Sequence, residues 1–174
     1  MKNIIFALLL LSMFGISNAF AENDITLYQG YAVDNGSQHN GGTTNSYGAE
    51  IERHWNNTFN YSLGYFNYGT MQVTPVESIK RDLISIQAVY PIQISDNFRL
   101  SFQGGPALAD TTQVMKTGSY VDNTHFVLVH GLTVSYLLTK NFSMVAMMQR
   151  TDFTQHTSDG VYLGLRFTPP SCCK

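Results

Sequence analysis

Beyond residue 21, apolar and polar residues alternate with a period of two in one segment after another. The segment Gly160–Phe167 shows this most clearly, with Val161, Leu163, Leu165 and Phe167 on one face and Tyr162, Gly164 and Arg166 on the other. Such alternation, bounded by turn residues, predicts β-strands with one apolar face. Eight strands are expected, at about 24–33, 44–55, 58–69, 80–94, 98–109, 123–138, 141–153 and 160–168.

The connections between these strands are sorted by length. Tight turns are predicted at 56–57, 95–97 and 139–140, and longer polar loops at 34–43, 70–79, 110–122 and 154–159. In an antiparallel arrangement, all the tight turns lie at one end and all the longer loops at the other. A soluble sandwich has no reason for this sorting, whereas bacterial outer-membrane barrels have short periplasmic turns and longer external loops. We therefore expect an all-β fold, an eight-stranded antiparallel up-and-down transmembrane β-barrel.

The first 21 residues have the features of a secretory signal peptide. Lys2 supplies a positive charge, residues 4–16 are apolar, and Ala19-Phe20-Ala21 is a cleavage motif of the A-x-A type. The apolar run is too short to span a bilayer as a helix. The expected organisation is a signal peptide at 1–21, an outer-membrane barrel at 22–168 and a short C-terminal tail at 169–174.

Aromatic residues gather near the predicted tight turns and near the end of the last strand. If the more apolar face of each strand points outward, these aromatic side chains form a ring at one height, as expected where lipid meets water. The predicted girdle consists of Trp55, Phe59, Tyr90, Phe98, Tyr136, Phe142 and Phe167. An opposite girdle is expected from Tyr31, Tyr47, Tyr65 and Phe126.

Composition supports a lipid-exposed surface and excludes other classes. Charged residues make up 13% of the chain, about half the share that is usual in soluble domains. Lysine and arginine number 10 against 12 aspartates and glutamates, so there is no basic footprint for nucleic acid. Cys172 and Cys173 are adjacent and have no histidine beside them, which does not make a zinc site. We interpret them as an incidental tail, with an intermolecular disulfide as the alternative, and we expect neither a metal site nor a cofactor.

With this layout the chain resembles the small eight-stranded outer-membrane barrels, the family of the outer-membrane protein A transmembrane domain and the OmpX-like barrels. The most specific piece is the terminal segment Tyr162–Phe167, although residues 168–174 follow it where the family ends on the aromatic. The resemblance implies the bacterial outer membrane as the location. It implies outer-membrane lipid, lipopolysaccharide and the barrel assembly machinery as partners, together with an extracellular ligand bound through the loops.

Charged residues are expected inside the barrel. Eight strands leave an interior just wide enough to be filled by side chains, so a general porin is not expected. The inward charges of the lower half are Glu50, Glu52, Arg99 and Arg166. Because a lone buried charge is costly, we expect Glu50 and Glu52 to contact Arg99 or Arg166 and to plug the lumen. A gated ion path or an acid–base pair is the functional alternative.

The upper lumen is expected to be apolar, with Phe66, Leu83 and Tyr162 among its inward residues, and could hold an acyl chain. Some small barrels are lipid A palmitoyltransferases or 3-O-deacylases, and the layout resembles the deacylase barrels too. A deacylase needs a serine nucleophile, a histidine base and an acidic partner. The His-x-Ser-Asn pattern of those enzymes is missing from Met148–Phe153, and His156-Thr157-Ser158 in the next loop is the nearest match.

The sequence therefore favours a non-catalytic barrel with a role in envelope integrity or surface interaction. A lipid A-modifying acyl hydrolase or acyltransferase remains the alternative. His130 is an odd residue, because it shares the apolar face of its strand near mid-strand and a polar group facing lipid at mid-depth is expensive. We expect a bulge or a different register to turn it inward, with a protein contact as the alternative.

Overall fold

Eight strands, each hydrogen-bonded to the strands before and after it, make up nearly all of the part of the chain that the structure describes. The computed structural model describes residues 23–35, 43–56, 58–74, 77–115, 117–153 and 157–170. The strands are β1 (Asn23–Asp34), β2 (Thr43–His54), β3 (Asn60–Thr74), β4 (Glu77–Ser95), β5 (Phe98–Val114), β6 (Tyr120–Thr139), β7 (Phe142–Asp152) and β8 (Thr157–Phe167). The first 21 residues lie outside the described part, so the signal peptide stays a prediction.

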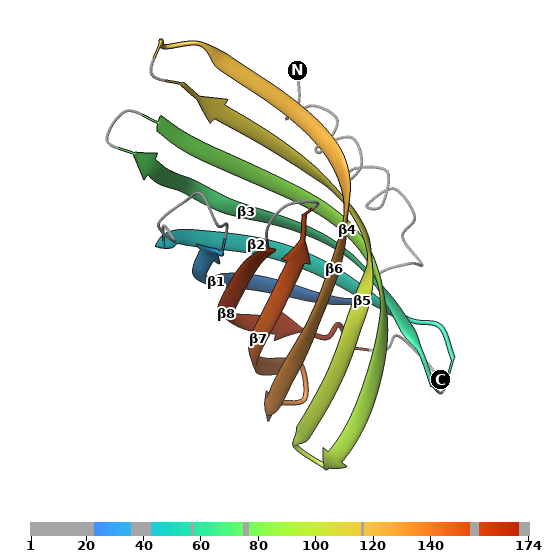
Figure 1. Ribbon diagram of the computed structural model, residues 1–174. Helices are drawn as coiled ribbons and strands as arrows, with labels where there is room; N and C mark the ends of the chain where they lie inside the picture. The colour runs from blue at the N-terminus through green and yellow to red at the C-terminus, as the bar shows by residue number, and fades with distance from the viewer. Residues whose placement is uncertain are drawn as a thin grey trace.

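The sheet closes on itself, because β1 pairs with β8 from Ile25 and Phe167 up to Asp34 and Ser158. All neighbouring strands are antiparallel, and Figure 1 shows them wrapped around one axis. The predicted eight-stranded up-and-down barrel is thus confirmed. Among the described residues, no helix is long and apolar enough to cross a membrane.

The register tilts the strands against the barrel axis. Following paired residues from Leu27 through β2, β3 and β4 leads to Leu108 on β5. The other way round, through β8, β7 and β6, the path arrives at Phe98 on the same strand. A stagger of this kind is what a closed barrel requires of its tilted strands. It also decides which side chains of distant strands share one level of the lumen.

Period-two alternation sorts the side chains into the lumen and the outer face. On β7 every second side chain from Ser143 to Thr151 is buried, and those between are exposed. The largest fully buried side chains include Tyr68, Tyr162 and Phe66, so aromatic rings fill the upper lumen as expected. The outward side chains are mostly apolar and exposed to the surroundings, for example Leu27, Leu163 and Met148 at 62–66%. This is the pattern of a barrel that contacts lipid.

Two of the predicted loops are wrong. Residues 70–79 and 110–122 are mostly strand, because β3 continues to Thr74 and β5 continues to Val114, where it pairs with Tyr120. Both segments are rich in polar residues, which made them look like loops, but their backbones keep the hydrogen-bond ladder. The β3–β4 and β5–β6 hairpins consequently extend beyond the other strands, towards the upper left of Figure 1. Residues 36–42 of the first predicted loop lie outside the described residues.

Candidate functional site

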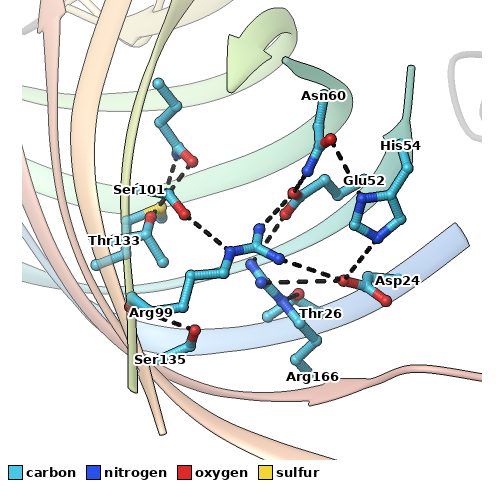
Figure 2. A network of polar contacts seen from close by, with 12 residues as sticks. Asp24, Thr26, Glu52, His54, Asn60, Arg99, Ser101, Thr133, Ser135 and Arg166 are labelled. Atoms are coloured by element: carbon cyan, nitrogen blue, oxygen red, sulfur yellow. Dashed lines mark hydrogen bonds and ion pairs between the residues drawn. The ribbon is translucent and has the colours of Figure 1, made fainter. Parts of the chain in front are cut away.

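The lower lumen holds a network of charged side chains from four strands (Figure 2). Glu52 on β2 binds both guanidinium groups that the sequence indicated. It forms an ion pair with Arg99 of β5, and its Oε2 lies 3.1 Å from Nη2 of Arg166 on β8. Glu52 is 1% exposed and Arg166 3%. A buried carboxylate between two guanidinium groups is compensated in charge.

Neighbouring polar groups complete this network. Asp24 of β1 lies 3.9 Å from Arg99 and 4.0 Å from Arg166, between atoms of opposite charge. Asn60 donates its amide to Glu52 at 2.6 Å and meets the ring of His54 at 3.2 Å. Sequence reasoning missed Asp24, whose place at the very start of the first strand gave no sign of a partner across the barrel.

Glu50 differs from the expectation for it. Its side chain is 1% exposed and points into the lumen one level above Glu52. No ion pair within 4.0 Å joins it to either guanidinium, and neither carboxylate oxygen has a hydrogen-bond partner among the described residues. Glu52 alone therefore makes the contacts expected of both glutamates.

A second buried charge pair lies at the upper end of the lumen. Arg81 of β4 donates to Asp34 of β1 at 2.8 Å and to the hydroxyl of Ser158 on β8 at 3.0 Å. Its guanidinium also stacks 4.7 Å from the ring centroid of Phe153. Arg81 and Asp34 are each 3% exposed. Sequence reasoning missed this pair, because residue 34 was assigned to a loop, although Arg81 does sit at an inward position of its strand.

Between the charged levels, hydroxyl and amide groups connect the aromatic side chains. Tyr68 shares a hydrogen bond of 2.6 Å with Thr151 and accepts one of 2.9 Å from Gln149. Tyr162 and Ser46 are joined at 3.1 Å. Tyr28, Phe66 and Tyr162 pack with ring centroids 5.4–6.2 Å apart. The described side chains of the upper lumen thus pack against one another where the sequence suggested room for an acyl chain.

The aromatic residues predicted near the turns lie on the outer face. Trp55 is 74% exposed, and Phe59, Tyr90, Tyr136 and Phe142 are between 42% and 48% exposed. Phe142 packs on Phe167 across the β7–β8 pair, with centroids 5.2 Å apart. Phe98 is partly exposed at the start of β5. The placement of these side chains is compatible with a girdle, which stays a prediction until their depth in a bilayer is measured.

A row of charged side chains crosses the outer face near the other end of the barrel. His130, Arg150 and Asp159 are register partners on β6, β7 and β8. Arg150 donates two hydrogen bonds of 2.7 and 2.9 Å to Asp159, and Asn35 donates to the same carboxylate at 2.7 Å.

The bulge that we expected at His130 is wrong. The register of β6 on β7 is regular there and shifts only between Leu137 and Thr139. The ring points outward, 56% exposed, and its Nδ1 lies 3.5 Å from Oδ2 of Asp152. Because β7 ends at Asp152, close above the partner of His130, the histidine lies near the outer rim and not at mid-depth. A polar group costs little at that level.

The outer rim holds part of what an acyl hydrolase would need. His130 and Asp152 form a histidine–carboxylate pair, but no serine of the described residues contacts them. Ser158 is turned into the lumen towards Asp34 and Arg81, and His156 lies outside the described residues. Among the described residues, no three of His, Cys, Asp and Glu are placed to hold a metal ion. Cys172 and Cys173 also lie outside the described part.

A closed eight-stranded barrel with an apolar outer face and with charged side chains buried in its interior is a small β-barrel of the bacterial outer-membrane type. Solved structures agree with this class, as the resemblance in sequence layout indicated. Neisserial surface protein A is similar with a TM-score of 0.74 and 17% identity, over 84% of this chain and 97% of that one. The N-terminal barrel of Pseudomonas aeruginosa OprF has a TM-score of 0.60 and 18% identity, over 84% and 97%.

Ail, the attachment invasion locus protein of Yersinia pestis, has a TM-score of 0.58 and 14% identity, over 84% of this chain and 99% of that one. At these identities the likeness establishes the fold, which is one that proteins of the bacterial outer membrane share. No protein-family model matches the chain, and no curated protein matches it in sequence.

Proposed function

We propose that this protein is an outer-membrane barrel with a plugged lumen, serving envelope integrity or surface interaction through its external part. The observation that carries the proposal is a pair of buried charge networks at the two ends of a filled interior. Glu52 with Arg99 and Arg166 occupies the lower end, and Arg81 with Asp34 the upper end. An ion crossing the barrel would have to break both networks, and each break leaves buried charges without compensation.

The external part of the proposal rests on the β3–β4 and β5–β6 hairpins. β6 pairs with β7 only from Leu128 onward, so its residues 120–127 extend beyond that strand. Side chains 121–124 are exposed on both faces, which means that they line no lumen. Segments of this kind, held on a rigid barrel, commonly carry the contacts to a partner.

The charge of these hairpins bears on the partner. Ail has been crystallised with the heparin analogue sucrose octasulfate. Here Lys80 is held by Asp82 at 3.4 Å, and Asp110 and Asp122 accept hydrogen bonds from threonines. Because carboxylates outnumber cations over the described part of the hairpins, we infer a partner other than a sulfated polyanion.

Conductance tests the plugged lumen. The mature chain, refolded and inserted into a planar lipid bilayer, is expected to give no discrete current steps under conditions in which a general porin conducts. Steps of uniform size from the wild-type chain would contradict the plug.

Complementation separates the two roles. In a strain that lacks the gene, uptake of a hydrophobic dye reports envelope integrity, and binding of whole cells to host surfaces reports interaction. A variant with residues 112–122 replaced by a two-residue turn retains the barrel. If it restores the dye barrier but not cell binding, the hairpin carries the interaction. If the deletion strain differs from wild type in neither measurement, the proposed roles fail.

The alternative of a lipid A-modifying enzyme has partial geometric support, because a histidine–carboxylate pair lies on the outer face without a serine beside it. Mass spectrometry of lipid A, with and without expression of the protein, decides between the two. An unchanged acylation pattern removes the enzyme, and the loss or gain of an acyl chain would replace the present proposal.

A further inference from the structure

The side chain of Glu50 is buried in the lumen without a hydrogen bond or an ion pair from the described residues to compensate its charge. Its carboxylate is 1% exposed, and both oxygens lack a hydrogen-bond partner within the described structure. An ionised carboxylate buried in this way is expensive, so native proteins compensate it with a partner of positive charge. The network one level below makes no direct contact with it, because both guanidinium groups are hydrogen-bonded or paired to Glu52 and Asp24 and neither forms an ion pair within 4.0 Å with Glu50.

Three groups beside Glu50 are likewise buried without a hydrogen-bond partner in the described part of the chain. The hydroxyl of Tyr28, the hydroxyl of Ser62 and the amide oxygen of Gln87 are also buried without a hydrogen-bond partner. These side chains are 0–4% exposed. They come with Glu50 from four consecutive strands, β1 to β4, so one patch of the lumen wall concentrates unpartnered oxygen atoms.

The register places these groups at one level. Glu50 pairs with Thr26 on β1, which lies one inward position below Tyr28. It also pairs with Gly64 on β3, which lies one inward position above Ser62. The tilt of the strands offsets these steps, so the groups lie at one level. Ser62 pairs in turn with Gln87 on β4. Gly64 has no side chain to separate Glu50 from β4. The amide nitrogen of Gln87 is already committed to Ser85 at 3.0 Å, which leaves its oxygen as an acceptor.

The described negative and positive side chains of the lower lumen differ in number. Three buried carboxylates, those of Asp24, Glu50 and Glu52, stand against the guanidinium groups of Arg99 and Arg166. His54 lies at the lower mouth, 53% exposed, and faces Asp24 at 3.9 Å. With the three carboxylates ionised and His54 neutral, the lower lumen is therefore one positive charge short within the described residues. Carboxylates and amide oxygens are acceptors only and cannot satisfy one another. The hydroxyl groups of Ser62 and Tyr28 each carry a donor, but no hydrogen bond joins either of them to Glu50.

We propose that Glu50, Gln87, Ser62 and Tyr28 form a binding site for one monovalent metal cation, of the class of Na⁺ or K⁺, in the middle of the lumen. Oxygen donors of this kind suit hard cations. One unit of charge balances the level, whereas a divalent ion would add a surplus charge next to two guanidinium groups. The site goes beyond the proposed function and does not depend on whether the barrel conducts.

Thermal unfolding of the refolded mature chain in detergent tests the site. Apparent Tm is measured in NaCl, in KCl and in N-methylglucamine chloride at equal ionic strength and pH. At a metal concentration about a hundredfold above Kd, Tm should rise by roughly 5 °C or more over N-methylglucamine. The variant Glu50→Gln should lose this dependence. Asp96→Asn, which removes an exposed carboxylate in a turn, should keep it.

A second variant and a thallium soak test the cation site independently of Glu50→Gln. If Glu50→Gln does not fold, Gln87→Met removes one neutral ligand and should shift the cation titration midpoint upward about tenfold. Crystals soaked in thallium(I) should give an anomalous peak beside Glu50. Equal Tm values in all three salts would overturn the proposal, as would a thallium peak only elsewhere. A Tm that changes with pH but ignores the metal would also overturn it, because a proton would then supply the missing charge.

Discussion

Replacing Arg166 by methionine removes one partner from a buried charge network and leaves the others in place. Arg166 contributes the contact of 3.1 Å to Glu52 and a hydrogen bond of 3.2 Å from its Nε to the hydroxyl of Thr26. It also faces Asp24 at 4.0 Å. Methionine fills a similar volume without a charge, so the change tests the electrostatics of the network and not its packing.

The loss in the free energy of unfolding depends on the contacts that remain in the variant. Removing one partner of a buried ion pair costs about 3–5 kcal/mol, chiefly because the other charge stays buried. Here Arg99 still contacts Glu52 and lies 3.9 Å from Asp24, so part of the compensation survives. We therefore expect a loss near the lower bound, about 3 kcal/mol, which corresponds to roughly a hundredfold in the ratio of folded to unfolded protein.

The chain contains its own probe for this measurement. Trp55 is the only tryptophan, and it lies on the outer face packed against Tyr61. Its fluorescence follows urea-induced unfolding in lipid vesicles, and linear extrapolation gives the free energy of unfolding for each variant. The matched control is Glu52→Gln with Arg166→Met, in which the charges of the pair are removed together.

The double variant should recover a substantial part of the loss, because no carboxylate at Glu52 is left to compensate. A coupling of about 1–3 kcal/mol between the two sites is the expected result of the cycle. The reasoning is refuted if Arg166→Met lies within about 0.5 kcal/mol of wild type. It is also refuted if the double variant is as unstable as the single one.

Three further experiments test the closing pair of strands β1 and β8, the depth of the aromatic girdle in the bilayer and the lipid-facing surface. A Cβ at Gly30 would collide with the backbone of β8, whereas one at Gly104 would have its nearest neighbour at 3.5 Å. Gly30→Ala should therefore abolish the folded, heat-modifiable gel band that Gly104→Ala keeps. Trp55 should be quenched most strongly by lipids brominated close to the headgroup, and quenching at the bilayer centre would contradict the girdle. Leu163→Arg should cost about 2–4 kcal/mol in vesicle unfolding, and a neutral effect would remove Leu163 from the lipid-facing midplane.

Period-two alternation was sufficient to predict the strands and their faces, because every transmembrane strand must separate lipid from lumen. A narrow interior forces opposite charges together, and on that ground Glu50 and Glu52 were expected to contact Arg99 or Arg166. Glu52 does so, whereas Glu50 does not. The Arg81–Asp34 pair could not be found in this way. It joins β1 to β4 across the lumen, and only the stagger of the whole barrel brings these two positions to one level.

The loops were harder to predict for a related reason. Segments 70–79 and 110–122 are rich in polar residues, which is typical of loops in water. Backbone pairing with a neighbouring strand does not require an apolar face, and such a hairpin remains a strand outside the membrane. The position of His130 relative to the end of the barrel depends in the same way on where β7 ends, which the sequence of β6 does not contain.

The outer face of β7 changes from apolar to charged near the end of the strand. Its outward residues are apolar from Phe142 to Met148 and become charged at Arg150. At about 3.3 Å per residue and a tilt near 40°, the distance from Phe142 to Arg150 along the barrel axis is roughly 20 Å, somewhat less than the apolar band of about 25 Å that is typical of outer-membrane barrels. β6 continues well past this level to Tyr120, and its tip is exposed on both faces. Variation that changes the interactions of the protein should therefore concentrate in residues 110–125, whereas variation in the lumen should preserve its charge balance.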